Sequence, residues 1–174
     1  MKAPIAKKIP TSETHHGITK HDDYKWLKAE NWQEVMQEPS LLPQDIRDYL
    51  EAENAFTKAQ MADTEVLQEK LFAEIKGRIK EDDSSVPAPD GKYFYFSTYV
   101  VGGQYPRFWR RLKDGGADQL MFDGNALAKG HEYFGFGGIA LSPDHQLAAW
   151  SYDNKGSEFY ELRVRDLSTG LDFD

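Results

Sequence analysis

The sequence contains no cysteine among its 174 residues. This absence excludes a disulfide framework and any metal site built from thiolates. Residues 1–10 carry lysines but no apolar core, so they do not form a secretory signal. No run approaches the roughly 18 apolar residues that a membrane helix needs. Together these absences predict a soluble, cytoplasmic chain without a membrane partner.

Positive charge is also scarce: 21 Lys and Arg against 29 Asp and Glu leave a net charge of −8. Binding to nucleic acid requires clustered Lys and Arg, so nucleic acid is excluded as a main partner. An acidic surface can attract basic peptides, although solubility is the commoner reason for such a charge. The apolar content of 40% and aromatic content of 13% are typical of a globular chain.

Several motifs that carry chemistry are missing. The sequence has no Gly-x-Ser-x-Gly nucleophile elbow, no Gly-x-x-x-x-Gly-Lys-Ser/Thr phosphate loop and no His-Glu-x-x-His helix. Residues 135–138 are rich in glycine, but no strand-to-helix context surrounds them, and they are interpreted as a tight entry to a strand. The remaining polar clusters give no site either.

One such cluster offers metal-ligand side chains on the N-terminal arm, at a spacing that matches no known site: His15, His16, His21, Asp22 and Asp23. The pair His131-Glu132 is interpreted as an exposed loop pair rather than an acid–base couple. The run 81–83 (Glu-Asp-Asp) is interpreted as a solvated turn, with attraction of cationic peptides as the alternative. We therefore assign no catalytic, metal or cofactor-binding residue, and the substrate-binding residues stay unknown.

The first half of the chain has a helical period. Residues 1–20 are polar and predict an extended arm. The string 31–34 (Asn-Trp-Gln-Glu) resembles a capping box, and Pro39 ends that short helix. Pro43 suits the first position of a second helix and Thr64 the N-cap of a third, which weakens at Gly77.

Both longer helices are expected to carry an apolar stripe on one side. The stripes consist of Ile46, Tyr49, Leu50 and Phe56 in the second helix, and of Leu67, Leu71, Phe72 and Ile75 in the third. Such stripes must be buried, and the rest of the chain is a poor candidate to cover them.

The second half has a strand period instead. Residues 92–100 (KYFYFSTYV) are apolar or aromatic on both alternating faces, which predicts a strand covered on both sides. Gly102-Gly103 form a turn, and residues 105–112 return as the second arm of a hairpin. A second hairpin is predicted from residues 147–152, through the turn 154–156, to residues 159–167.

These two hairpins superimpose without a gap at an offset of 54 residues. The identical pairs are Pro89/Pro143, Asp90/Asp144, Ser97/Ser151, Gly102/Gly156, Arg111/Arg165 and Gly116/Gly170. A repeat near 50 residues made of strands and turns is typical of β-propeller blades. Residues 138–141 would then be the innermost strand of the second blade, and residues 119–122 the outermost strand of the first. Chance likeness between two antiparallel hairpins is the alternative.

Propellers close with about four to eight blades, so two blades cannot close a ring. The sequence ends at Asp174, straight after a turn at residues 167–170. We therefore expect a fragment of a longer product, and we expect the isolated chain to be inactive and prone to aggregate through open strand edges.

An ordered set of strings resembles the N-terminal region of the prolyl oligopeptidase family of serine peptidases, most nearly its oligopeptidase B branch. The strings lie at residues 7–10 (KKIP), 16–17 (HG), 22–27 (DDYKWL), 49–54 (YLEAEN), 74–79 (EIKGRI), 99–105 (YVVGGQY) and 138–144 (GIALSPD). The resemblance covers nearly the whole chain. One departure is Asp23, where many relatives have proline.

The resemblance implies a mixed α and β fold in which N-terminal helices precede antiparallel four-stranded blades of an incomplete β-propeller, seven-bladed in the family. Residues 1–80 would be an arm and helices that pack on an α/β-hydrolase domain in cis, absent from this chain. Residues 81–174 would be the first two blades. The Ser-Asp-His triad would lie beyond Asp174, so no catalytic residue is transferred to this chain.

For function, the resemblance implies a cytoplasmic serine oligopeptidase without a cofactor that cuts short basic peptides after Lys or Arg. The propeller would limit the size of the substrate. Two alternatives stay open: a prolyl-specific relative of the same family, and a non-enzymatic propeller that binds proteins.

Overall fold

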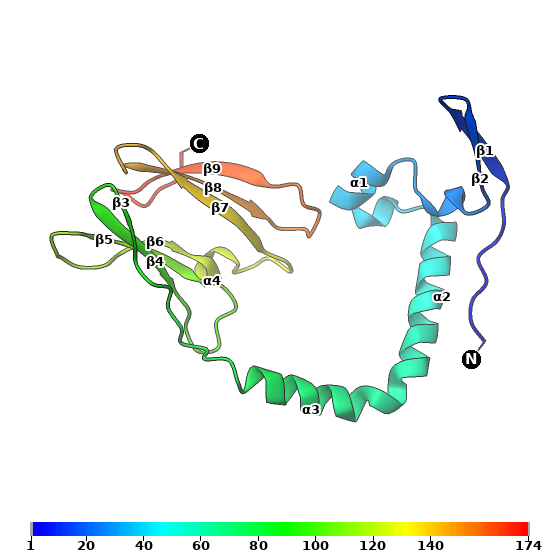
Figure 1. Cartoon of the computed structure of the whole chain (residues 1–174), viewed down its shortest axis with the longest axis horizontal. Helices are drawn as coiled ribbons and strands as arrows, with labels where there is room; N and C mark the ends of the chain where they lie inside the picture. Colours follow the sequence, from blue (N-terminus) through cyan, green and yellow to red (C-terminus); the bar gives the residue numbers. More distant parts are fainter. Residues whose placement is uncertain (1, 174) are drawn as a thin grey trace. The chain divides into compact units, whose positions relative to one another are not determined.

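The structure, a computed structural model, describes residues 2–173 of the chain. It divides into two compact units at Gly77 and Arg78. Figure 1 shows helices in the N-terminal unit and two sheets in the C-terminal unit. Because the placement of one unit relative to the other is not determined, each unit is described by itself.

The N-terminal unit begins with a β-hairpin. Strands β1 (Thr11–His15) and β2 (Ile18–Asp22) are antiparallel, with Thr11 paired to Asp22 and His15 to Ile18. The two turn residues, His16 and Gly17, have φ of 52° and 78°. Two positive φ values give the turn whose twist matches paired strands. The predicted extended arm therefore holds a paired hairpin.

The three predicted helices are present. They are α1 (Trp32–Gln37), α2 (Gln44–Met61) and α3 (Glu65–Lys76), with 3₁₀ turns η1 (Lys25–Leu27), η2 (Pro39–Leu41) and η3 (Ala62–Thr64) between them. The predicted capping box is wrong, because the Asn31 side chain donates to the Leu41 carbonyl instead of capping α1. Thr64 likewise donates to the Met61 carbonyl. None of the helices in residues 2–173 is long and apolar enough to cross a membrane.

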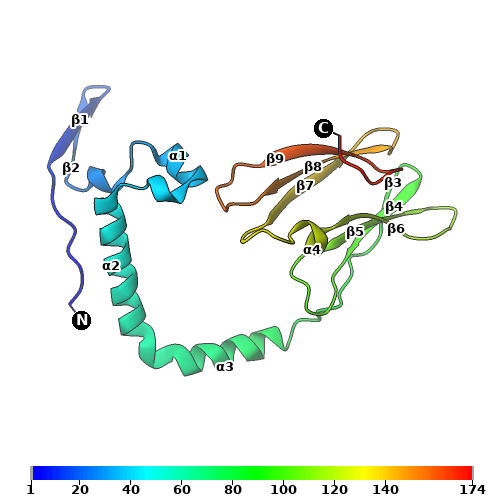
Figure 2. The ribbon, with the colours of Figure 1, turned by 180° about the vertical axis from the view of Figure 1, so that it is seen from behind.

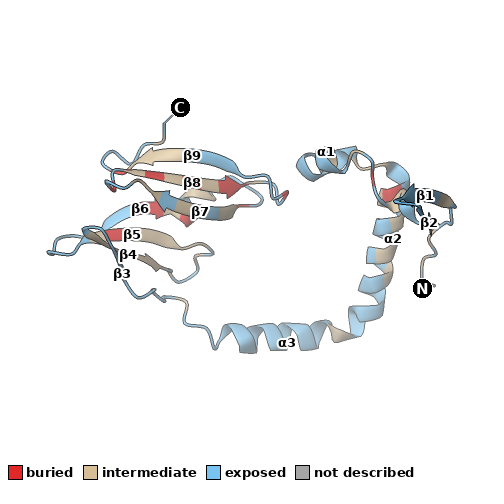
Figure 3. Cartoon of the chain, turned by 45° about the horizontal axis from the view of Figure 1, so that its top comes forward, coloured by how far each residue is buried: buried red, intermediate tan, exposed pale blue. Residues whose placement is uncertain are grey.

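The apolar stripe of α3 is largely uncovered, whereas that of α2 is covered in part. Among the described residues of this unit, only Ala29 and Ile46 are buried. In α3 the exposed fractions are 55% for Leu67 and 69% for Phe72. Pale blue runs along the whole of α3 in Figure 3. Within this unit α3 therefore depends on propensity and backbone hydrogen bonds, whereas the buried Ile46 and the contact of Tyr49 with Trp26 support the start of α2.

The C-terminal unit consists of two antiparallel sheets, visible from both sides in Figures 1 and 2. The first sheet has the order β3 (Ala88–Asp90), β4 (Tyr93–Thr98), β5 (Arg107–Leu112) and β6 (Gln119–Asp123). A single helical turn, α4 (Gly124–Leu127), follows β6. The second sheet has the order β7 (Gly135–Leu141), β8 (Leu147–Asp153) and β9 (Glu161–Asp166), and a bridge between Arg165 and Asp172 extends its outer edge.

The repeat at an offset of 54 is confirmed by the register of the two sheets. In the first sheet Tyr93 pairs with Leu112, and in the second Leu147 pairs with Asp166. Each remaining pair of β4 and β5 has its counterpart in β8 and β9 at the same offset. The turn φ values repeat as well: 77° at Gly102 and 76° at Gly156. The predicted inner and outer strands, 138–141 and 119–122, lie within β7 and β6.

The core of this unit lies between the two sheets. Figure 3 shows the buried residues on the strands whose faces meet there. The cluster consists of Met121, Phe122, Phe134, Ala148, Trp150, Tyr152 and Leu167. Burial of aromatic rings on both facing surfaces holds the sheets together.

Candidate functional site

Aromatic rings from both sheets meet at the boundary between them. Phe136 of β7 lies between the sheets, with its ring centroid 4.9 Å from that of Phe108 and 5.8 Å from that of Phe122. Trp150 of β8 contacts the Phe122 ring at 5.4 Å. Aromatic pairs at these separations add about 0.5–1.5 kcal/mol each beyond burial.

Polar side chains also cross this boundary. The buried Arg110 guanidinium donates to the carbonyl of His145, and Gln119 donates to the carbonyl of Leu167. The Tyr95 hydroxyl lies 2.8 Å from His145 Nδ1. Burial raises the pKa of Tyr95, against the opposing effect of Arg110. These bonds fix the lateral position of one sheet on the other.

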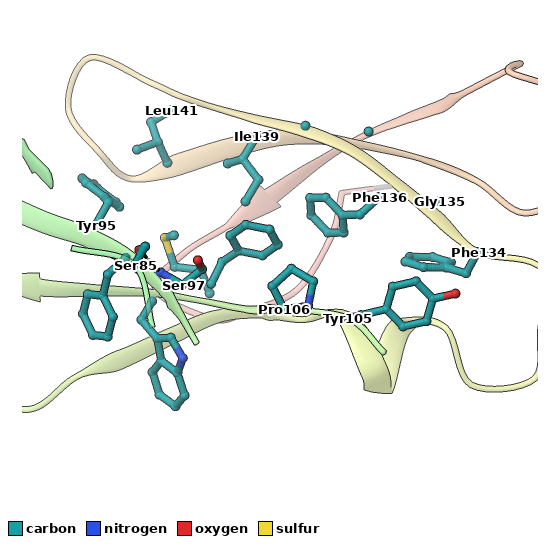
Figure 4. A pocket seen from close by; sticks show the side chains of 16 residues that line it. Ser85, Tyr95, Ser97, Tyr105, Pro106, Phe134, Gly135, Phe136, Ile139 and Leu141 are labelled. Carbon is teal, nitrogen blue, oxygen red and sulfur yellow. Dashed lines mark hydrogen bonds between the residues drawn. The ribbon is translucent and has the colours of Figure 1, made fainter. Parts of the chain in front are cut away.

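A groove of about 700 Å³ opens along the same boundary. Figure 4 shows Phe136, Ile139 and Leu141 of β7 on one side of it, and Tyr105 and Pro106 on the other. Its lining contains serines and tyrosines but no Asp, Glu, Lys, Arg or His. The groove can therefore hold an apolar group, but its lining provides no general base.

Buried carboxylates order the turns around the sheets. Asp153, at the end of β8, accepts hydrogen bonds from the backbone N–H groups of Lys155, Gly156 and Glu158 at 2.8–3.0 Å. Burial opposes ionisation of Asp153, but these N–H donors outweigh it and lower its pKa. Asp153 therefore has a structural role in the loop that links β8 to β9.

An ion pair closes the outer edge of the second sheet. Arg165 donates to both carboxylate oxygens of Asp172 at 2.7 and 3.0 Å. Burial acts against the charge of Asp172, but hydrogen bonds from Arg165 and Trp150 outweigh it and lower the pKa. Arg165 also donates to the Met121 carbonyl and lies 4.5 Å above the Phe122 ring. One side chain thus connects both sheets.

Of the polar clusters considered from the sequence, one reaches this boundary, through the contact of His131 with Phe134 of the core cluster. On the hairpin, Ser12 Oγ lies 2.8 Å from His21 Nδ1, a contact that follows from their cross-strand pairing. His131 stacks on Phe134. The backbone of Asp83 accepts a hydrogen bond from Tyr99 N–H, which ties the acidic run to the end of β4. In residues 2–173 no group of three His, Asp or Glu side chains could hold a metal ion.

Three residues with clear structural roles carried no signal in the sequence. Arg110 and Asp153 are buried charges, and nothing in their neighbours along the chain predicts burial. His145 has a φ of 60°, at the repeat position of Gly91, which has a φ of 50°. The shared offset could have identified that turn position, but not the contact of the His145 ring with the opposite sheet.

Comparisons with known proteins match both units of the chain. Residues 4–174 match the family described as prolyl oligopeptidase, N-terminal beta-propeller domain. Dipeptidyl aminopeptidase BI from Pseudoxanthomonas mexicana is 32% identical over 95% of this chain and 24% of its own length. Protease 2 from Moraxella lacunata is 30% identical over 98% of this chain and 24% of its own length.

A solved structure agrees with the sequence relatives. Oligopeptidase B from Leishmania major superimposes with a TM-score of 0.80 at 25% identity, over 97% of this chain and 25% of that one. The chain thus spans about a quarter of the length of the relatives it matches. The repeated sheets, the helices that precede them and the match over residues 4–174 lead to one conclusion: the chain belongs to the prolyl oligopeptidase family and corresponds to its N-terminal β-propeller region.

Proposed function

We propose that this chain is the N-terminal part of a cytoplasmic serine oligopeptidase of the oligopeptidase B type, which hydrolyses short peptides after Lys or Arg. The observation that carries the proposal is the similarity to Protease 2 over 98% of the chain. The superposition on oligopeptidase B from Leishmania major supports it.

In this proposal the chemistry takes place in a C-terminal α/β-hydrolase domain encoded beyond Asp174. A serine hydroxyl there attacks the peptide carbonyl and passes its proton to a histidine, which protonates the leaving amine. Water then hydrolyses the acyl-enzyme, and preorganised donors stabilise the oxyanion in both steps. None of residues 1–174 takes part in these steps.

The chain contributes enclosure and attachment. The two sheets form part of a wall that admits short, flexible peptides and excludes folded proteins. The exposed stripe of α3, with Leu67 and Phe72, is proposed to pack on the hydrolase domain in cis. Burial of that stripe would supply the hydrophobic contact that the N-terminal unit lacks.

A second candidate is an aminopeptidase that releases dipeptides from free N-termini. It is favoured by the 32% identity to dipeptidyl aminopeptidase BI. A prolyl-specific enzyme has weaker support, since the matched prolyl endopeptidase from Elizabethkingia meningoseptica is 23% identical. The names of the matched relatives do not agree on one cleavage preference, so that preference is measured directly.

The test uses the complete gene product and three amide substrates: an N-blocked arginine amide, an N-blocked proline amide and an unblocked dipeptidyl amide. We expect the arginine substrate to have a kcat/KM at least about a hundredfold higher than the others, and a fluorophosphonate to abolish turnover. Preference for the unblocked dipeptide would support the second candidate instead. If the complete gene product shows no turnover and its sequence has no nucleophile elbow, the remaining alternative is a non-enzymatic propeller that binds proteins.

Exclusion of folded substrates is measured with the same enzyme, on one substrate sequence presented as a free peptide and within a folded protein. A basic peptide excised from a small folded protein should be cut rapidly, and the folded protein itself should resist. Equal rates on the two would contradict the proposed role of the sheets. The 174-residue chain by itself is the matched control and should cut neither substrate.

A further inference from the structure

A buried histidine lies in the turn between β7 and β8. His145 is 8% exposed and has a φ of 60°, in the left-handed region. Its repeat counterpart is Gly91, for which a positive φ carries no steric cost. For a histidine the same conformation is strained, so the contacts of the His145 ring must compensate for it.

The His145 ring lies on the first sheet. Its centroid is 5.9 Å from that of the Tyr95 ring, in a stacked arrangement, and 5.7 Å from that of the Tyr93 ring. Its Nδ1 lies 2.8 Å from the Tyr95 hydroxyl. The buried Arg110 guanidinium donates to the backbone carbonyl of the same histidine. One ring nitrogen and one carbonyl thus attach the turn to the first sheet.

The repeat does not account for this cluster of polar and aromatic groups. Besides the histidine, its members are Tyr93, Tyr95 and Arg110. The residues 54 positions after these three are Leu147, Ala149 and Val164. None of those side chains can ionise or form a hydrogen bond. The second sheet is built without these groups, so the cluster is specific to this one junction.

The hydrogen bond at Nδ1 requires a neutral histidine ring. Burial raises the pKa of Tyr95 above the ordinary value of 10.0, against the effect of Arg110, so the hydroxyl keeps its proton at neutral and mildly acid pH. Arg110 acts on that hydroxyl as a hydrogen-bond donor, and an arginine side chain cannot accept. The hydroxyl proton is therefore donated to Nδ1, which is an acceptor only while it carries no proton of its own.

We propose that His145 is a pH-sensitive latch between the two sheets. The neutral ring accepts the Tyr95 proton and holds the turn in place, whereas a proton on Nδ1 removes the acceptor and sets a positive ring beside Arg110. Histidine ordinarily gains its proton at about pH 6.5, so the latch weakens in the mildly acid range. Every part of the latch belongs to this chain, so it is independent of the reaction proposed above.

Other charged groups around the ring are exposed to solvent. On its own turn, Asp144 carries a carboxylate whose Oδ1 already accepts two hydrogen bonds. On the first sheet, Asp90 and Lys92 flank Gly91, against which the ring packs. Water screens these three exposed groups, whereas Arg110 is 3% exposed and acts through the protein interior. Repulsion by Arg110 therefore decides the sign, and the folded chain disfavours the protonated ring.

Urea unfolding of the 174-residue chain at about pH 7.5 and about pH 5.5 tests the latch, with near-UV circular dichroism reporting the packing of the rings. The unfolded chain takes up the proton more readily than the latched one, so the equilibrium constant for unfolding should rise as the pH falls. His145→Asn is the reference, because asparagine tolerates a positive φ and can place at the Nδ1 position an acceptor that does not titrate. The rise should be at least about threefold greater in the unchanged chain than in this variant. An equal or greater rise in the variant would overturn the latch.

Two tyrosine variants separate the hydrogen bond from the ring contact. Tyr95→Phe removes the donor to Nδ1, whereas Tyr93→Phe keeps it, and both variants keep an aromatic ring beside His145. We expect the pH-dependent rise to shrink at least about twofold in Tyr95→Phe, because the neutral ring then loses the partner that favours it. The rise should be unchanged in Tyr93→Phe. The same pH dependence in both variants would refute the hydrogen bond as the sensor.

Discussion

The two units of this chain bury their apolar residues to very different degrees. In the C-terminal unit, seven aromatic and aliphatic residues form one cluster between two sheets. In the N-terminal unit, the described residues include two buried ones, Ala29 and Ile46, while α3 exposes Leu67 and Phe72 by more than half. Both units have regular backbone hydrogen bonding, so hydrogen bonding alone does not distinguish them.

This difference places most of the stability of the chain in the C-terminal unit. A helix of 12 residues such as α3 is marginal in water unless a packed face supports it. The sheets instead bury large rings against one another, and burial of apolar area is the main favourable term in folding. The comparison therefore predicts that equivalent substitutions have large effects in the C-terminal unit and small ones in the N-terminal unit.

The largest expected effect comes from Trp150→Ala. Trp150 is 3% exposed, and its ring lies between Phe136 at 5.7 Å and Tyr152 at 5.2 Å. Truncation leaves a cavity, and we expect a loss of about 3–5 kcal/mol in the free energy of unfolding. Urea titration followed by near-UV circular dichroism measures the loss.

Trp32→Ala is the matched control in the other unit. Trp32 is 47% exposed at the start of α1, and its truncation should change the free energy of unfolding by about 0.5 kcal/mol or less. Similar losses for the two tryptophans would contradict the contrast between the units.

The sequence predicted the repeat well, for a physical reason. Ladder register depends on turn positions and alternating faces, and both are local: Gly102 and Gly156 fix the turns, while Phe108 and Leu162 keep the period. The helices were predicted by their stripes, but the cap hydrogen bonds predicted for Asn31 and Thr64 do not form. A nearby carbonyl competes for those side chains, at Leu41 and at Met61.

The contacts between the sheets could not be predicted in this way. Arg110 meets the His145 carbonyl across 35 residues, and that pairing depends on how two sheets dock. The repeat contains one further identical pair, Asp118 and Asp172, at the same offset of 54. With Arg111 and Arg165 they indicate a repeated geometry within each sheet, although not which sheet face is covered.

A smaller effect is expected from Gly91→Ala. Gly91 has a φ of 50°, and a Cβ there would overlap Nε2 of the His145 ring. That ring cannot move freely, because it is hydrogen-bonded to Tyr95 and also stacks on the Tyr95 ring. We expect the steric overlap to destabilise the C-terminal unit by about 2 kcal/mol, in addition to the cost of a positive φ for alanine. Thermal unfolding measures it.

Gly17→Ala separates the two causes. Gly17 also has a positive φ, 78°, but a Cβ there would meet nothing within 4 Å. This variant should show the cost of the backbone conformation alone. In the His145→Gly background, where the overlapping ring is gone, Gly91→Ala should cost no more than Gly17→Ala does in the unchanged chain. A larger cost in that background would mean that the ring is not the obstacle.

The smallest effect is expected from Asp153→Asn, and it depends on pH. Its pKa in the folded chain is lowered below the ordinary value of 3.8, with burial opposing and backbone N–H donors causing the shift. Above pH 3.8 the carboxylate is ionised in both states, so its stabilisation is fully present. As the pH falls further, the unfolded chain binds the proton first and the stabilisation is lost. Asp153→Asn should therefore cost about 1 kcal/mol at pH 7, and progressively less as the pH falls below the ordinary pKa.

Asp45 provides the contrast from the N-terminal unit. Its pKa is also lowered, chiefly by a hydrogen bond from Lys7, but the pair is exposed to solvent. Salt screens an exposed pair, whereas the Asp153 carboxylate that accepts the backbone donors is buried. Urea titrations at neutral and at acid pH, each in low and high salt, should show a pH-dependent loss for Asp153→Asn that salt barely alters. If salt removed that loss, the turn carboxylates would stabilise the sheets no more than an exposed ion pair stabilises the helices.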